Sequence, residues 1–95
     1  MFENLDNIHR ALVSLFIEQT LLAMGKPIYD KVVGELEKKY HCYLPDCYDH
    51  PEYLRNVLYE LFGESGRNVV ESITRDMDEF KGTKKIGNFV DILRQ

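Results

Sequence analysis

The sequence has little of several features that define whole classes of proteins. It contains no Trp, only two Cys and three Pro, and an average number of Gly among its 95 residues, which disfavours a collagen or a disulfide-rich scaffold. None of its apolar runs approaches the roughly 18 residues of a transmembrane helix. Its first six residues include two acidic and no basic side chains, whereas a secretory signal peptide begins with basic residues. We therefore expect a cytoplasmic protein without a membrane segment.

The chain is short but rich in apolar residues. They make up 44% of the sequence and charged residues 29%, which is typical of a globular chain. We expect one soluble domain that spans residues 1–95. A chain of this size buries about 60 to 65% of its unfolded surface, which is enough for a core but too little for a deep enclosed active site. We therefore expect no cofactor, no small-molecule substrate and no enzymatic activity.

Formal charge is distributed unevenly along the chain. The net charge is −4, which disfavours broad binding to nucleic acid, because phosphates are neutralised by a clustered Lys/Arg surface. Residues 81–95 contain four basic residues and one acidic residue, so this segment is basic and the first 80 residues are strongly acidic. This asymmetry is typical of a solvated helix start, and it could also steer an acidic partner.

Helical periodicity, interrupted by Gly and Pro, runs through the whole chain. Apolar residues recur at spacings of three and four, and strand-like alternation is almost absent. The predicted fold is an all-α compact bundle of four amphipathic helices plus a short C-terminal helix. The first two predicted helices cover about residues 5–23 and 27–40. The third begins after Asp49 and is closed by Gly63, the fourth begins at Ser65 or Asn68 and stops at Gly82, and a short last helix follows Thr83.

Local signals mark where these helices begin and end. Gly25 can end the first helix in a left-handed conformation, and Pro27 suits the first turn of the second. Asp49 and Glu52 resemble a capping box around Pro51, which predicts that Asp49 caps the third helix. Gly82 is the predicted end of the fourth helix.

The first helix carries more apolar residues than a thin bundle can cover from one side. One line of residues has the heptad-like spacing of a helix seam; it consists of Leu5, Ile8, Leu12, Leu15, Gln19 and Leu22. Val13, Ile17 and Leu21 add apolar positions elsewhere around the helix. The line either faces the core or forms a homodimer seam, and a dimer through the last helix is the alternative. The candidate interaction surface is Ile8, Leu12, Leu15 and Gln19.

A loop between the second and third helices gathers the residues with the most reactive side chains. His41, Cys42, Cys47 and His50 lie within ten residues, and this donor set would suit zinc. The adjacent His41 and Cys42 and the small loop argue against a closed tetrahedral site. A reduced, buried cysteine pair is favoured in the cytoplasm, while a Cys42–Cys47 bridge and a catalytic thiol stay open as alternatives.

The middle of the chain resembles a known family. The most specific residues are His50-Pro51-Glu52, within the run 48–55, and Leu61-Phe62-Gly63, which follow that run and precede Ile73. Their order is similar to that of the archaeal Nitrosopumilus output domain family, type five, over about residues 20 to 80. The resemblance implies a small helical output or interaction module in archaeal signal transduction, and it supplies no catalytic residue.

Three classes of function follow, and the first is favoured. It is a helical interaction or regulatory module that docks a protein partner or a second copy. The second is a DNA-binding regulator that would use the basic residues Arg67, Arg75, Lys81, Lys84 and Lys85. Acidic residues interleave with these bases and would face phosphate; they are Glu71, Asp76, Asp78 and Glu79. The third is a small metal-binding or thiol protein built on the Cys/His loop.

Overall fold

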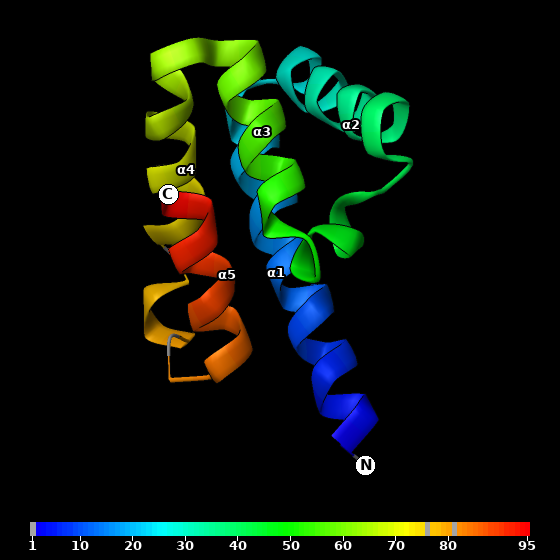
Figure 1. Cartoon of the computed structure of the whole chain (residues 1–95), viewed down its shortest axis with the longest axis vertical. Helices are drawn as coiled ribbons and strands as arrows, with labels where there is room; N and C mark the ends of the chain where they lie inside the picture. The colour runs from blue at the N-terminus through cyan, green and yellow to red at the C-terminus, as the bar shows by residue number, and fades with distance from the viewer. Residues whose placement is uncertain (1, 76, 81) are drawn as a thin grey trace.

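The residues described by the computed structural model of the chain form five α-helices and three short 3-10 helices (Figure 1). The structure describes the backbone of residues 2–75, 77–80 and 82–95, and their side chains except those of residues 2–6 and 79. In chain order the elements are α1 (Phe2–Met24), α2 (Lys26–Tyr40), η1 (Leu44–Tyr48), α3 (Pro51–Phe62), η2 (Gly63–Ser65), α4 (Gly66–Arg75), η3 (Asp78–Phe80) and α5 (Lys84–Arg94). The described residues contain no strand, so the predicted all-α fold is confirmed.

The longest helix, α1, sets the long dimension of the molecule. Its 23 residues span about 35 Å at 1.5 Å per residue, close to the largest extent of the molecule, 37 Å. It packs against α2, η1 and α4, while α3 packs against α2, α4 and α5. The N-terminal part of α1 extends beyond the other helices (Figure 1). None of the helices described is both long and apolar enough to cross a bilayer.

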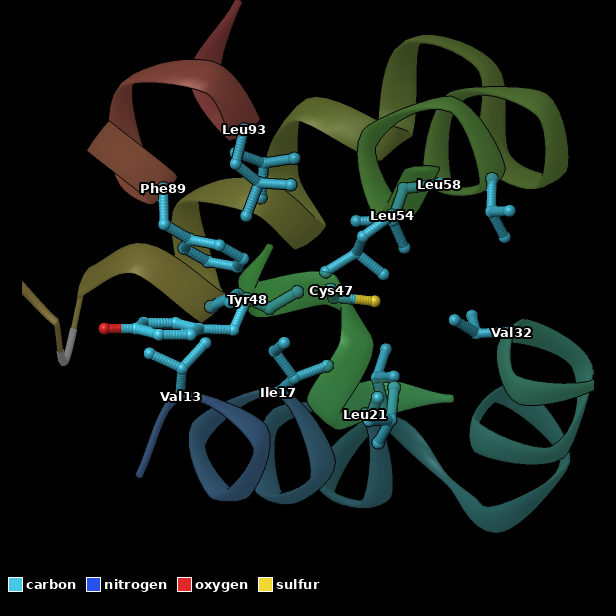
Figure 2. Packing of buried hydrophobic residues seen from close by; sticks show 14 of the residues in the cluster. Val13, Ile17, Leu21, Val32, Cys47, Tyr48, Leu54, Leu58, Phe89 and Leu93 are labelled. Atoms are coloured by element: carbon cyan, nitrogen blue, oxygen red, sulfur yellow. The ribbon is translucent and has the colours of Figure 1, made fainter. Parts of the chain in front are cut away.

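Buried apolar residues from every α-helix form one cluster. From α1 the cluster takes Val13, Ile17 and Leu21, each at most 1% exposed. Figure 2 shows these three side chains pointing toward Cys47 and Tyr48 of η1, with α3 and α5 residues closing the core from the other side. The segment between α2 and α3 therefore contributes Cys42, Leu44, Cys47 and Tyr48 to the core, while its other residues are exposed.

The second and third helices begin close to where the sequence predicts. Pro27 and Pro51 each lie in the first turn of a helix. Gly25 has φ 123°, a positive value that favours glycine. His41 ends α2 in the left-handed conformation, with φ 52°, and its backbone N–H donates to Glu37 O at 3.0 Å. The helix thus ends at Tyr40, as predicted, although the residue that ends it in a left-handed conformation is a His and not a Gly.

The predicted end of the fourth helix at Gly82 is wrong. The helix α4 ends at Arg75, and residues 78–80 form η3. The tighter bonding begins at Thr74, whose carbonyl accepts from Met77 N at 3.1 Å, and Met77 O then accepts from Phe80 N at 2.9 Å. These i→i+3 bonds are typical of a 3-10 turn, and they leave Met77 fully buried. Asp76 and Lys81, named above as possible DNA-binding neighbours, lie outside the described residues.

The predicted capping box at the start of α3 is also wrong. The N-cap position is occupied by His50, which makes no side-chain capping bond. Asp49 lies one residue earlier, and its two carboxylate oxygens accept from Arg10 and Lys85 instead. Charged partners from distant helices satisfy this carboxylate more strongly than a backbone N–H would.

Candidate interaction surface

The helix α1 is apolar on two opposite sides. Ile17 is buried in the core, and Ile8 lies nine residues earlier, about two and a half turns of helix and hence on the other side. Ile8 is 60% exposed, Leu15 45% and Leu22 42%. We call the residues on this second side the outward face of α1: Ile8, Leu12, Leu15, Gln19 and Leu22.

All four predicted interaction residues lie on the outward face. Ile8, Leu15 and Gln19 are exposed, and Leu12 is half-buried. The core is supplied instead by Val13, Ile17 and Leu21, so the seam-like spacing does not mark the core side of the helix. The side chain of Leu5, the first residue of the predicted seam, lies outside the described residues.

Two shallow grooves border the outward face. One, of about 340 Å³, lies between α1 and Pro45 of η1, and Ala11, Leu15 and Glu18 line its α1 side. The other, of about 310 Å³, lies between the C-terminal half of α1 and Ser72 of α4. The exposed side of α1 is therefore a ridge with a groove on each flank, a shape into which side chains of another helix can interdigitate.

A charged junction fixes the position of α1 on the rest of the molecule. Asp49 Oδ2 accepts from Arg10 Nη1 at 2.5 Å, and Asp49 Oδ1 accepts from Lys85 Nζ at 2.8 Å. Arg10 Cζ and Lys85 Nζ also lie 5.3 and 4.6 Å from the centre of the Tyr48 ring, within the range of cation–π attraction. The hydrogen bonds from Arg10 and Lys85 lower the pKa of Asp49. One carboxylate thus holds α1 to α5 across the start of α3.

The two cysteines are free thiols and both are buried, as the sequence predicts. Cys47 is fully buried, and its Sγ donates to Tyr43 O at 3.7 Å. Burial is the largest cause that raises the pKa of each thiol, most strongly that of Cys47. A catalytic or metal-binding cysteine needs the opposite shift, toward the thiolate. The geometry therefore gives Cys47 a packing role.

The two histidines of the same loop do not join the thiols. His41 and His50 are exposed, whereas Cys42 and Cys47 are buried. In the part of the chain that the structure describes, no group of three or more His, Cys, Asp or Glu is placed to hold a metal ion. The candidate zinc ligands thus share a loop but no common site.

An aromatic stack beside this loop was not predicted from the sequence. The rings of Tyr40 and Tyr53 are parallel within 6° and 4.2 Å apart, and His50 stacks on Tyr53 at 4.7 Å. The phenol oxygen of Tyr40 accepts from Asn56 Nδ2 at 3.3 Å. The only available signal is the spacing of His50 and Tyr53, three residues apart across a helix start. The stack joins the end of α2 to the start of α3.

The basic residues proposed for DNA binding do not form one patch. Arg67 lies at the start of α4 and Arg75 at its end, about 12 Å apart along the helix at 1.5 Å per residue. Lys85 is held by Asp49. The starts of α4 and α5 lie at opposite ends of the bundle (Figure 1), which separates Arg67 from Lys84. Among the described residues, no helix therefore presents a row of basic side chains to a groove of DNA.

Comparisons of the chain with protein-family models, with characterised proteins and with solved structures found no match. The resemblance to the archaeal output domain family therefore stays a prediction.

Proposed function

We propose that this protein is a small non-enzymatic interaction module that docks another helical protein surface, a second copy included, on the outward face of α1. The observation that carries the proposal is that α1 buries one apolar side while the opposite apolar side stays open to solvent. Large apolar side chains gathered on one exposed face are typical of interaction sites.

The fold itself does not need the outward residues. Val13, Ile17 and Leu21 already supply the α1 contribution to the core, and a helix at the surface of a small domain needs only one apolar stripe. The exposed side chains of Ile8, Leu15 and Leu22 leave apolar area in water, which costs free energy that burial against a partner would recover.

The other functions considered have less support. The most buried thiol is held in its neutral form, and the basic residues are spread over separate ends of the bundle. The resemblance to archaeal output domains supports a place in signal transduction in the cytoplasm. An output module acts by contact with other proteins, which agrees with an open apolar helix face.

Light scattering on the wild type and on an Ile8→Glu variant tests the proposal. We expect the wild type to associate as its concentration rises and Ile8→Glu to stay monomeric, because a carboxylate in an apolar seam carries a large desolvation cost. Tyr43→Glu is the matched control, since Tyr43 is 56% exposed and Ile8 60%, but Tyr43 precedes η1 and is not part of α1.

Circular dichroism should show that both variants keep the wild-type helix content, because neither changes a buried side chain. Equal association of the wild type and Ile8→Glu would contradict the proposed surface. A wild type that stays monomeric at high concentration would remove self-association and leave only a foreign protein as the partner.

A further inference from the structure

We propose that Cys42 and Cys47 form a redox modification site, at which a peroxide converts the two thiols into a disulfide within the folded chain. The site lies where α2 meets η1, and it is independent of the docking function proposed for α1. Three features carry the inference: a closed turn that draws the two residues together, an interaction between their side chains, and the partial exposure of Cys42.

The turn between the two cysteines is closed by two hydrogen bonds. Tyr43 follows Cys42 directly, and Asp46 precedes Cys47. The N–H of Tyr43 donates to Asp46 Oδ2 at 2.9 Å, and the N–H of Asp46 donates to Tyr43 O at 3.0 Å. The N–H of Cys42 also donates to Leu36 O at 3.4 Å, which holds this flank of the turn to the end of α2. Because the two ends of the turn are joined, the cysteines that flank it are drawn together.

The two thiols interact with each other inside the core. Both residues belong to the buried apolar cluster. Cys47 Sγ donates to Tyr43 O at 3.7 Å, so this sulfur lies beside the residue that follows Cys42. Burial is the largest influence on the pKa of each thiol, which it raises, and a hydrogen bond between the two side chains is a further influence on both. A disulfide requires Cα atoms within about 7 Å, and two interacting thiols on one closed turn are within reach of that separation.

A disulfide suits the surroundings of the pair better than an ionised thiol does. It carries no charge and no S–H donor, so an apolar core accommodates it without the desolvation cost of a charged group. The closed turn also keeps the two sulfurs at a high local concentration, which favours a bond within the chain over a bridge between two chains. The bond joins the end of α2 to η1, and both of these elements pack against α1.

Cys42 is the point of entry for the oxidant, because it is 5% exposed whereas Cys47 is fully buried. The Cys42 thiolate attacks hydrogen peroxide, the O–O bond breaks, hydroxide leaves and a sulfenic acid forms. The Cys47 sulfur then attacks the Cys42 sulfur, the S–O bond breaks, and the second hydroxide leaves as water with the thiol proton. In sum the two thiols lose two electrons and two protons, and the peroxide becomes two waters. Because burial raises the pKa of both thiols, the reaction is slow at neutral pH and its rate rises with pH.

Mass spectrometry of the native protein after treatment with hydrogen peroxide at mildly alkaline pH tests the bond. Trypsin leaves both cysteines in one peptide, residues 40–55. We expect this peptide to become two hydrogen atoms lighter and unreactive toward iodoacetamide, and we expect dithiothreitol to reverse both changes. Cys42→Ser is the matched variant, because it removes the entry thiol at the more exposed of the two positions. Its peptide should not lose two hydrogen atoms.

The melting temperature shows whether the bond fits the native geometry. A fitting disulfide across this short loop should raise the melting temperature of the oxidised protein by about 5 to 15 °C over the reduced protein, whereas a bond that distorts the turn lowers it.

A wild-type peptide that gains oxygen atoms instead of losing hydrogen, or that stays unchanged, would overturn the inference. An oxidised protein that melts below the reduced one would overturn it as well. Both outcomes use the wild type alone, so they decide the question even if Cys42→Ser does not fold.

Discussion

Two isoleucines lie on opposite sides of α1. The same substitution at each of them can show which side of the helix is buried in the core. Ile17 is fully buried and Ile8 is 60% exposed, and both lie within the same helix. Ile17→Ala and Ile8→Ala remove the same atoms from the same secondary structure. Any difference between the two variants in the free energy of unfolding therefore reports the environment of the side chain alone.

The expected magnitudes are far apart. Ile17→Ala leaves a cavity among core residues, and such changes cost about 2 to 5 kcal/mol. In a domain of this size that loss lowers the melting temperature by about 10 to 30 °C. Ile8→Ala gives up only the buried minority of one side chain, worth about 1 kcal/mol at most, and gains about 0.4 kcal/mol from the higher helix propensity of Ala. Its net cost in the monomer is about 0.5 kcal/mol.

Urea unfolding followed by circular dichroism, at a protein concentration where light scattering shows monomers, measures both values. If Ile8→Ala cost as much as Ile17→Ala under these conditions, the assignment of the two sides of α1 would be refuted. At higher concentration the cost of Ile8→Ala should grow, because association stabilises only the folded chain. The cost of Ile17→Ala relative to the wild type should depend little on concentration.

Three further predictions concern the junction, a close helix contact and a thiol. The folded-state pKa of Asp49 is lowered from 3.8. The contribution of Asp49 to the free energy of unfolding is therefore complete above that value and is lost as the pH falls through the lowered pKa. Asp49→Asn should therefore cost about 1 kcal/mol in urea titrations at pH 7 and much less in strong acid; a constant cost would contradict the ion pairs. Gly66→Ala should destabilise by about 1 to 3 kcal/mol, because a Cβ there would lie 3.0 Å from Leu58 O, whereas Gly34→Ala, with open space around it, should stabilise. Cys47 should resist an aromatic disulfide reagent until urea unfolds the chain, since it is fully buried with a raised pKa; rapid reaction in the native state would contradict this.

Helix boundaries were predictable wherever a residue with a fixed conformational preference marks them. Pro27 and Pro51 fix the backbone angle of a first helical turn, and both helices begin there. Thr74 lies near a helix end that local sequence signals could not predict. Its hydroxyl donates to Val70 O at 2.8 Å and accepts from Arg94 Nε at 3.1 Å, and α4 ends one residue later. A bond to a residue 20 positions away cannot be read from local periodicity.

The candidate surface was predicted, but not which side of α1 enters the core. Periodicity identifies an apolar stripe by contrast with polar residues, and α1 offers little contrast because Val13 and Ile17 on one side are as apolar as Ile8 and Leu15 on the other. The role of Asp49 was missed for a related reason. Its sequence neighbours suggest a cap, whereas Arg10 and Lys85 reach it from 39 and 36 residues away.

The parallel rings of Tyr40 and Tyr53 give this chain a spectroscopic signal of its own. Because the sequence contains no Trp, tyrosine dominates its near-ultraviolet absorption. Two phenol rings 4.2 Å apart and nearly parallel are fixed chromophores in a chiral setting, and such signals vanish when side-chain packing is lost while helices persist. Near-ultraviolet circular dichroism, compared between the wild type and a Tyr40→Leu variant because Tyr48 is also fixed in the core, can therefore follow the packing of α2 on α3 without a label, independently of the far-ultraviolet signal of the helices.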